Sequence, residues 1–460
     1  MNDEIKEEYT NIIKVKDDCD VIRFNKSGDK PEFELPEGTR LDWCSESRFS
    51  KSELRAHVEP WLASLFQSEH LSILVGSGLT SAIQYAAGAS SNNGMNTSQK
   101  FNVFEKEITR AANQSAKDAG RGEANIEDRI RVANEVINGL NVLQGNSDLP
   151  GIGDKLGTLK KDFENIIKEF TSNILTIERS IAVATPDKKE AAFNKLVMFL
   201  MSFASRPGTR DRLNIFTTNY DRLIEAGADV AGLRLIDRFV GALSPIFRSS
   251  RMDIDMHYNP PGIRGEPRYL EGVARFTKLH GSLDWINTGS NIRRIGLPFG
   301  AETIMPYINA AGIGGKYSRL MIYPNSSKDR ETTEYPYTEL FRDFAAALCR
   351  PNSTLVTYGY SFGDDHINRV IRDMLTIPST HLVIICYDDS TGRIMDKYNS
   401  WGHQSQMSLI IGKDIANIDD LVNYYLPKPS IDMASIRMSD ILKQRFDQPI
   451  KRNQEGEDNK

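Results

Sequence analysis

One short segment limits the possible folds of this chain more than any other. The apolar run LSILV at residues 71–75 ends abruptly in GSG at 76–78, and LTSAIQYAA, which has the composition of a helix, follows directly. A strand, a glycine turn and a helix in this order form the opening unit of a nucleotide-binding α/β fold. The chain is therefore expected to contain a parallel sheet with helices on its faces.

Strand-length apolar runs return in the second half of the chain. We expect strands at 213–218, 275–280, 353–360, 381–387 and 407–411, and helices that begin near Tyr220, Glu339, Asp364 and Ile418. Runs of this kind are typical of strands whose two faces are both covered. The expected fold class is α/β, with a Rossmann-like parallel sheet, helices on both faces and an inserted all-helical module.

The helical module accounts for the middle of the chain, which has no strand pattern. Apolar residues recur three or four positions apart from Lys155 to Ile181, and such a stripe must pack against other helices. We divide the chain into an N-terminal arm or edge of the core (1–50), a Rossmann-like domain (51–90 and 206–430), a helical insert (91–205) and a partly disordered polar tail (431–460).

Composition excludes several classes of protein. The chain has 57 basic and 62 acidic residues, so no global field favours nucleic acid or an anionic membrane. Its longest apolar runs are strand-sized, and its charged N-terminus lacks the apolar core of a secretory signal. The four cysteines include no C-x-x-C pair, so we expect no structural zinc. The sequence predicts a cytoplasmic protein with no membrane segment.

Four segments at expected strand ends carry residues that could do chemistry. In the first, at 76–81, Gly76 and Gly78 permit a tight turn and close approach of backbone amides to a phosphate, at the positive end of the next helix. Ser77, Thr80 and Ser81 are further candidate cofactor-binding residues. The match to the dinucleotide fingerprint is partial, because Ser81 stands where its third glycine would be.

The second segment is FTTNYD at 216–221. Its candidates are Asn219, for catalysis, and Thr218 and Asp221, for cofactor binding. Polar side chains directly after an apolar strand cost stability unless they cap a helix or touch a ligand. Two interpretations stay open: Asn219 or Asp221 caps the helix that begins near Tyr220, or these residues contact a ligand at the carboxyl end of the sheet.

The third segment, KLHGSLDW at 278–285, places His280 at another strand end. Histidine can serve as a general base near neutral pH because its ordinary pKa lies there. The alternative is a core histidine that is hydrogen-bonded to backbone.

The fourth segment is YGYSFGDDHIN at 358–368. Gly359 and Ser361 are placed to approach a ribose or an adenine from a second side of the crevice, and Phe362 joins them as a candidate cofactor-binding residue. One aspartate of the DD pair should cap the next helix, with His366 on that helix's surface.

Together and in this order, the segments GSG, TTNYD, KLHGS and GYSFGDDHIN resemble the sirtuin-like NAD-consuming domains of bacterial antiphage defence systems. The resemblance covers roughly 51–412 in outline and is carried by about thirty residues. It implies that the pyrophosphate of NAD lies on the turn at 76–78. Asn219 would then bond the nicotinamide ribose and help to position a water, with His280 as the base and Asp221 orienting the site. The bond that breaks would be the N-glycosidic link.

The chain departs from deacylating sirtuins in two ways. It has no four-cysteine zinc module, and no loop reading like Gly-Ile-Pro-Asp-Phe-Arg follows its glycine turn. Without an acyl-lysine to attack the ribose, water becomes the expected nucleophile. The resemblance thus implies an NAD hydrolase that acts in antiphage defence by NAD depletion, with NAD as its substrate.

An NAD-depleting activity must be restrained in healthy cells. We expect control by homo-oligomerisation or by a partner, because stand-alone chains of this size resemble the sirtuin subunits that assemble with a HerA-like hexameric ATPase. A phage-derived or nucleic-acid trigger is a further expected partner. Two alternatives to hydrolysis stay open: an NAD-dependent protein deacylase or ADP-ribosyltransferase, and a non-catalytic scaffold subunit that senses NAD or ADP-ribose.

Overall fold

The computed structural model describes residues 9–15, 18–28, 32–44, 47–89, 99–118, 122–145, 150–208, 210–250, 254–258, 268–310, 316–322 and 335–428. The expected tail, 431–460, lies outside these ranges. No helix among the described residues is both long and apolar enough to span a membrane.

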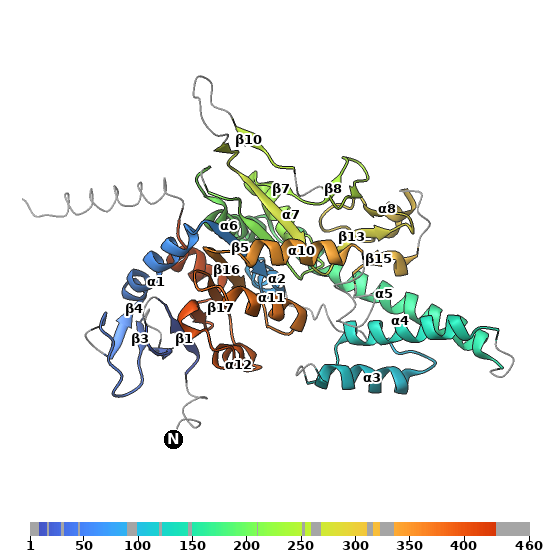
Figure 1. Ribbon diagram of the computed structural model, residues 1–460, viewed down its shortest axis with the longest axis horizontal. Helices are drawn as coiled ribbons and strands as arrows, with labels where there is room; N and C mark the ends of the chain where they lie inside the picture. The colour runs from blue at the N-terminus through green and yellow to red at the C-terminus, as the bar shows by residue number, and fades with distance from the viewer. Residues whose placement is uncertain are drawn as a thin grey trace, which may run out of the picture.

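Parallel strands form the centre of an eleven-stranded sheet (Figure 1). From edge to edge, the parallel part consists of β18 (Met407–Ile411), β17 (His381–Cys386), β16 (Ser353–Tyr358), β5 (His70–Val75), β6 (Asn214–Thr217), β12 (Val273–Lys278) and β7 (Arg234–Ile236). The six strands expected from the sequence are β5, β6, β12, β16, β17 and β18, each within two residues of its expected bounds.

The order of these six strands defines the fold. Numbered by their place in the chain, they run 3-2-1-4-5-6 from β12 to β18, which is the order of a doubly wound Rossmann sheet. The expected α/β, Rossmann-like class is confirmed. The order reverses between β5 and β16, and ligands of such sheets bind outside the carboxyl ends of the strands at this switch point.

The N-terminal residues extend the sheet at the β18 edge. Strand β1 (Asn11–Lys14) pairs antiparallel with β18, and β2 (Ile22–Lys26), β3 (Glu32–Glu34) and β4 (Arg48–Ser50) follow in order. The ring of Phe24 lies 5.1 Å from those of both Phe33 and Phe49, and these rings join the core on one face of the main sheet. The extension covers an edge of the parallel sheet that would otherwise present unpaired backbone groups.

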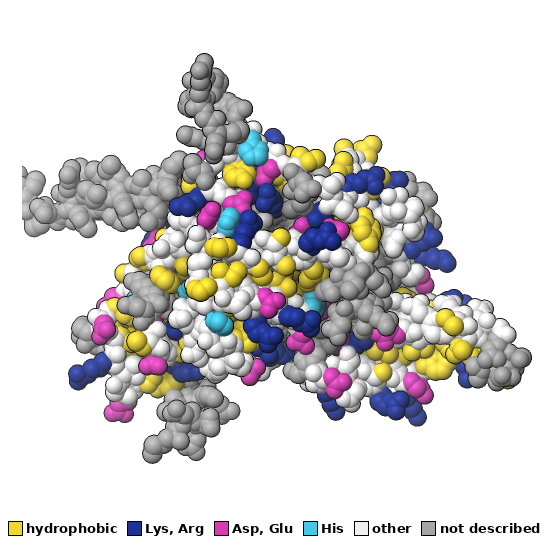
Figure 2. Space-filling view, viewed as in Figure 1, with side chains coloured by type: hydrophobic (Ala, Val, Ile, Leu, Met, Phe, Trp, Pro, Cys, Tyr) yellow, Lys and Arg dark blue, Asp and Glu magenta, His cyan; other side chains and the backbone are white. Residues whose placement is uncertain are grey.

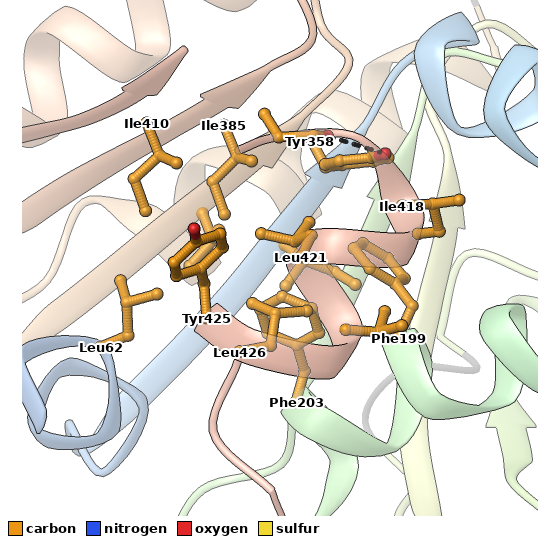
Figure 3. Packing of buried hydrophobic residues seen from close by; sticks show 14 of the residues in the cluster. Leu62, Phe199, Phe203, Tyr358, Ile385, Ile410, Ile418, Leu421, Tyr425 and Leu426 are labelled. Carbon is orange, nitrogen blue, oxygen red and sulfur yellow. Dashed lines mark hydrogen bonds between the residues drawn. The ribbon is translucent and has the colours of Figure 1, made fainter. Parts of the chain in front are cut away.

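One face of the sheet is covered by helices from distant parts of the chain. They are α1 (Lys51–Phe66), α2 (Ser77–Ala86), α6 (Pro186–Ala204), α7 (Leu223–Ala231), the short α13 (Ile418–Asp420) and the π-helix η4 (Leu421–Tyr425). Figure 3 shows Leu62 of α1, Phe203 of α6 and Tyr425 of η4 in this core. Tyr358 of β16 reaches the same core, where its hydroxyl donates to the carbonyl of Ala416.

The opposite face is covered by α10 (Tyr337–Leu348), α11 (Asp365–Leu375) and α12 (Arg393–Ser400). Successive residues of a strand point to opposite faces. Thus Leu355 of β16 packs with this second group of helices, whereas Val356 packs with the first. Both residues are buried, which explains why the strands lack a polar face.

Three helices form an arm that extends from the sheet in Figure 1: α3 (Glu105–Asp118), α4 (Ile126–Leu143) and α5 (Ile152–Ala182). The arm has its own core, which it shares with a small second sheet. That sheet has the order β15 (Leu320–Met321), β13 (Ser282–Asn287), β14 (Ile292–Arg294), β9 (Ile246–Phe247) and β8 (Phe239–Val240). Figure 2 shows hydrophobic side chains on the surface of the arm. Val142, at the end of α4, is 85% exposed.

The helices of the expected insert do not all pack alike. Helix α6 falls within 91–205 by sequence, but its buried side chains pack against the main sheet with those of α2 and α7. Shorter elements complete the described chain: the paired strands β10 (His257–Tyr258) and β11 (Arg268–Tyr269), α8 (Met305–Ala310), η2 (Tyr317–Arg319) and η3 (Gln404–Gln406).

Burial makes one histidine of the sheet a source of acid sensitivity. His381 of β17 contacts the Ser408 hydroxyl through Nε2 at 2.9 Å, and the indole of Trp61 donates to that same hydroxyl. Burial, with a smaller contribution from Lys14, lowers the pKa of His381 to about 4. Below its ordinary pKa of about 6.5, the unfolded chain therefore takes up a proton that the folded chain refuses.

We predict that the free energy of unfolding falls by up to about 3 kcal/mol through this group as the pH drops from 6.5 to 4. The variant His381→Gln keeps a polar side chain but does not titrate, so it should lose this part of the slope. Urea unfolding of both proteins at pH 7 and pH 5 measures the difference. An identical loss of stability in both proteins would contradict the prediction.

Candidate functional site

Two glycine-containing turns meet at the switch point of the sheet. A Cβ atom placed on Gly76 would lie 2.3 Å from the carbonyl oxygen of Gly359, and one on Gly78 would lie 2.5 Å from the Gly359 Cα. Gly359 itself has a φ of +59°, a conformation that side-chain-bearing residues rarely adopt. The glycines at the ends of β5 and β16 thus allow the two backbones to pack directly against each other.

The amides of this turn are already partly engaged within the protein. The amide of Gly76 donates to the carbonyl of Tyr358 at 3.0 Å, and that of Gly78 donates to the carbonyl of Gly359 at 3.1 Å. Packing therefore accounts for both glycines without a phosphate. The N-terminus of α2 begins at Ser77, whose side chain is exposed, as is that of Ser81 one turn later. A bound anion would meet these hydroxyls and the end of the helix.

Asn219 is held in one orientation by its amide nitrogen. Nδ2 donates to the carbonyl of Gly76 at 3.0 Å and to the hydroxyl of Thr80 at 3.1 Å. Because a carbonyl oxygen can only accept, the nitrogen end of the amide must face Gly76. The Asn219 Oδ1 atom makes no hydrogen bond to the described chain, so the amide offers it as an acceptor to a ligand.

Asp221 completes the network around Thr80. The Thr80 hydroxyl donates to Asp221 Oδ2 at 2.8 Å, and Asp221 Oδ1 accepts from the backbone amide of Leu223, the first residue of α7. Asp221 thus bonds the first turn of the helix and also orients Thr80, although the N-cap residue of this helix is Arg222. Asn219 does not cap this helix.

His280 lies beside Asn219 along the edge of the sheet. Thr217 of β6 is in register with Lys278 of β12. Asn219 and His280 therefore each lie two residues beyond the last register pair, just past the ends of two neighbouring strands. The tight turn after His280 requires Gly281, whose φ is +94° and whose Cβ would lie 2.2 Å from the carbonyl oxygen of Met321.

The loop after β16 is held by its own side chains. Phe362 is only 1% exposed, and its ring packs between those of Tyr360 and Trp401. The side-chain amide of Asn368 donates to the carbonyl of Phe362 at 2.9 Å. The Phe362 ring therefore belongs to the core, whereas Ser361 is exposed at the tip of the loop.

One histidine of this loop differs from expectation. His366 is 7% exposed, not a surface residue, and its Nε2 lies 3.4 Å from Nε2 of His280. Its ring packs edge-on against Phe341 of α10, at 4.8 Å between centroids. The polar sequence GDDH suggested exposure, but the packing of α11 against α10 buries this position.

A buried lysine supports the segment that carries Asn219. The side chain of Lys278 is 1% exposed, and its ammonium group donates to the carbonyl of Asp221 and to Glu225 Oε1. Burial raises the pKa of Glu225 above its usual range even though Lys278 opposes the shift. Sequence reasoning missed Lys278, although a charge inside the apolar run RFTKLH is costly unless it is paired.

The helical arm also contacts the Asn219 segment. The Tyr220 hydroxyl donates to Glu127 of α4 at 2.8 Å. Arg222 forms a buried ion pair with Glu178 of α5 and also donates to the carbonyls of Leu297 and Pro298. Burial raises the pKa of Glu178 in spite of Arg222. The partners of each contact lie at least 44 residues apart in sequence, so no local pattern revealed them.

The same edge of the sheet opens into a cavity beyond β16. Its volume is about 680 Å³, and its described lining residues come from the ends of β17 and β18, from α12 and from β1 and β2. The charged residues there are of both signs, including Arg23, Asp388 and Lys413. None of these lining residues belongs to the four sequence segments. Among the described residues, no group of three or more His, Cys, Asp or Glu side chains could hold a metal ion.

The strand order and the residues gathered at the carboxyl ends of β5, β6, β12 and β16 define a Rossmann-like α/β protein with a polar site at its switch point. Residues 213–405 match the family model described as SIR2-like domain, which supports a sirtuin-like family. SIR2-like domains use NAD. No curated protein matches the chain significantly.

The match contains three of the four segments. Asn219, Asp221, His280 and the loop from Gly359 to His366 lie inside it, whereas the Gly76–Ser81 turn precedes it. The structure joins that turn to the matched region through the Asn219 amide and the Gly359 backbone. The candidate site is thus built from both parts of the chain.

We predict that Gly76→Ala destabilises the fold. The φ of Gly76 is −100°, which any residue can adopt, so the cost comes from the collision of the new Cβ with the Gly359 backbone. Overpacking of this kind costs about 1–3 kcal/mol. Gly157→Ala is the matched control, because a Cβ there meets nothing within 4 Å and α5 should gain up to about 1 kcal/mol. Chemical denaturation of the three proteins tests this, and equal stability of wild type and Gly76→Ala would refute it.

A second prediction concerns the arm. Glu178→Gln should lower the free energy of unfolding by about 3 kcal/mol, because it leaves the buried Arg222 guanidinium without its counter-charge. Glu302→Gln removes an exposed ion pair with Arg179 and should cost less than about 1 kcal/mol. Denaturant midpoints of both variants measure the contrast, and similar small losses in the two would show that the buried pair contributes little.

Proposed function

We propose that this chain hydrolyses NAD to nicotinamide and ADP-ribose. The observation that carries the proposal is the fixed amide of Asn219, which leaves Oδ1 without a partner in the described chain, just past a strand whose neighbour ends before His280. An acceptor oxygen and an imidazole on adjacent strands suit a ribose, whose hydroxyls are donors and can also lose a proton. The match to a SIR2-like domain supports NAD as the ligand.

The reaction needs little covalent chemistry from the protein. Water forms a bond to C1′ of the nicotinamide ribose while the C–N bond breaks, and the electron pair of that bond neutralises the pyridinium ring of the leaving nicotinamide. The proton lost by the water passes to solvent through His280. Asn219 Oδ1 holds the ribose and the water, and Thr80 with Asp221 holds Asn219. Orientation and electrostatic stabilisation then supply most of the rate.

Hydrolysis is favoured over transfer to an acylated lysine by the start of α2. Residues 77–86 are helical directly after the glycine turn, so the extended loop of deacylating sirtuins has no counterpart there. The sequence also lacks paired cysteines for the zinc module of those enzymes. A protein deacylase or ADP-ribosyltransferase would need its acceptor protein before nicotinamide is released.

The direct test compares purified wild type with the two single variants Asn219→Ala and His280→Ala. We predict that wild type releases nicotinamide from NAD and that each substitution lowers the rate at least about 100-fold, as expected for loss of a positioned base or anchor. Chromatography of the products measures release, with and without a candidate acceptor protein.

Asn141→Ala on α4 and the exposed His257→Ala on β10 are matched controls that should leave the rate unchanged. NAD binding without release under any condition would favour the scaffold that senses NAD or ADP-ribose. Release that depends on an acceptor would favour the transferase.

We further propose that the activity serves antiphage defence through NAD depletion and is controlled by homo-oligomerisation or by a HerA-like hexameric ATPase. This proposal rests on the resemblance of the four segments to defence sirtuins. In infected cells, NAD should fall with wild type and stay constant with Asn219→Ala. Copurification of untagged ATPase with tagged chain tests the partner, and a chain that remains monomeric and binds no ATPase would refute this form of control.

A further inference from the structure

The contact between His280 and His366 joins two distant parts of the site. His280 follows β12, whereas His366 lies in the first turn of α11, after β16. Strands β5 and β6 lie between β16 and β12 in the sheet. The two Nε2 atoms nevertheless approach to 3.4 Å. The pair therefore bridges the carboxyl edge across the strand end that carries Asn219.

The surroundings of His366 make it the more rigid partner. Its side chain is buried, and its ring is seated edge-on against Phe341. The next two residues of α11, Ile367 and Asn368, are also buried, and Asn368 bonds the loop at Phe362. His280 is only partly buried. In this pair, His366 is the fixed support and His280 is the residue that can face a ligand.

Two imidazole Nε2 atoms can share a hydrogen bond only when one carries a proton and the other does not. A His280 that is bound to His366 through Nε2 must present Nδ1 to the ligand. We propose that His366 is a positioning residue, which fixes the ring orientation and tautomer of His280 for the hydrolysis proposed above. This inference rests on that proposed function, because positioning matters only if His280 takes part in the reaction.

Two substitutions separate the hydrogen bond from packing. His366→Phe keeps an aromatic ring against Phe341 but has no group that can bond His280. His366→Gln loses the ring, but its side-chain Oε1 can accept from the Nε2–H that His280 must carry if Nδ1 is to act as the base. A purely structural role predicts that phenylalanine is the better replacement, whereas positioning predicts that glutamine is.

The first measurement is the rate of nicotinamide release as a function of NAD concentration, with NAD affinity measured by calorimetry. We expect His366→Phe to lower kcat at least about tenfold with KM and NAD affinity unchanged, since misplacement of a reacting group by about 1 Å can cost a hundredfold. His366→Gln should recover most of that loss. Equal rates for His366→Phe and wild type, or a glutamine variant no better than the phenylalanine one, would overturn the inference.

A second measurement does not depend on activity. The ring-nitrogen chemical shifts of His280 report its tautomer, and they can be assigned by their loss in His280→Asn, because the chain has only seven histidines. In mildly alkaline buffer, wild type and His366→Gln should show one tautomer, and His366→Phe a mixture. This pattern in a chain that does not release nicotinamide would uphold the positioning and refute the hydrolysis. Unchanged shifts in His366→Phe would refute the positioning whatever the activity.

Discussion

The direct contact between the backbones at the ends of β5 and β16 is the constraint on which the geometry of the site depends. Any side chain at Gly76, Gly78 or Gly359 would hold these two strand ends apart. Their contact fixes the first turn of α2, where Thr80 receives the Asn219 amide and donates to Asp221. The glycine turn at 76–78 resembles a phosphate-binding turn in the sequence. In the structure its glycines allow β5 and β16 to pack together, and the polar site lies on this contact.

The segment 219–222, which follows β6, bonds to two different parts of the molecule. Asn219 and Asp221 bond to the glycine turn and to Thr80, whereas the intervening Tyr220 and the following Arg222 bond to Glu127 and Glu178 of the helical arm. The ammonium group of Lys278 also donates to this segment, at the carbonyl of Asp221. Residues 219 and 221 thus bond to the site, and residues 220 and 222 bond to the arm. A shift of the arm would therefore displace the site residues as well.

Much of the main sheet was predictable because its central strands are buried on both faces and therefore appear in the sequence as continuous apolar runs. The strands β1–β4 and the small second sheet were not predicted, because they are two to six residues long and lack the longer continuous apolar runs of the central strands. The pairing of Arg222 with Glu178 was hidden for another reason, since the two residues lie 44 positions apart in the sequence. Asn219 and His280 were accessible to sequence reasoning because each follows a strand, whereas the burial of His366 depends on how α11 packs against α10.

The position of β5 in the sheet has a consequence for how the chain is made. Its neighbours are β6, which begins at Asn214, and β16, which begins at Ser353. During synthesis, the glycine turn leaves the ribosome slightly more than 280 residues before the loop against which it packs. Contacts between residues so distant form slowly, because a long loop must close first. A ribosome-bound chain that has not yet reached residue 359 therefore has one half of the switch point without the other, and the site forms only after the loop at residue 359 has been made.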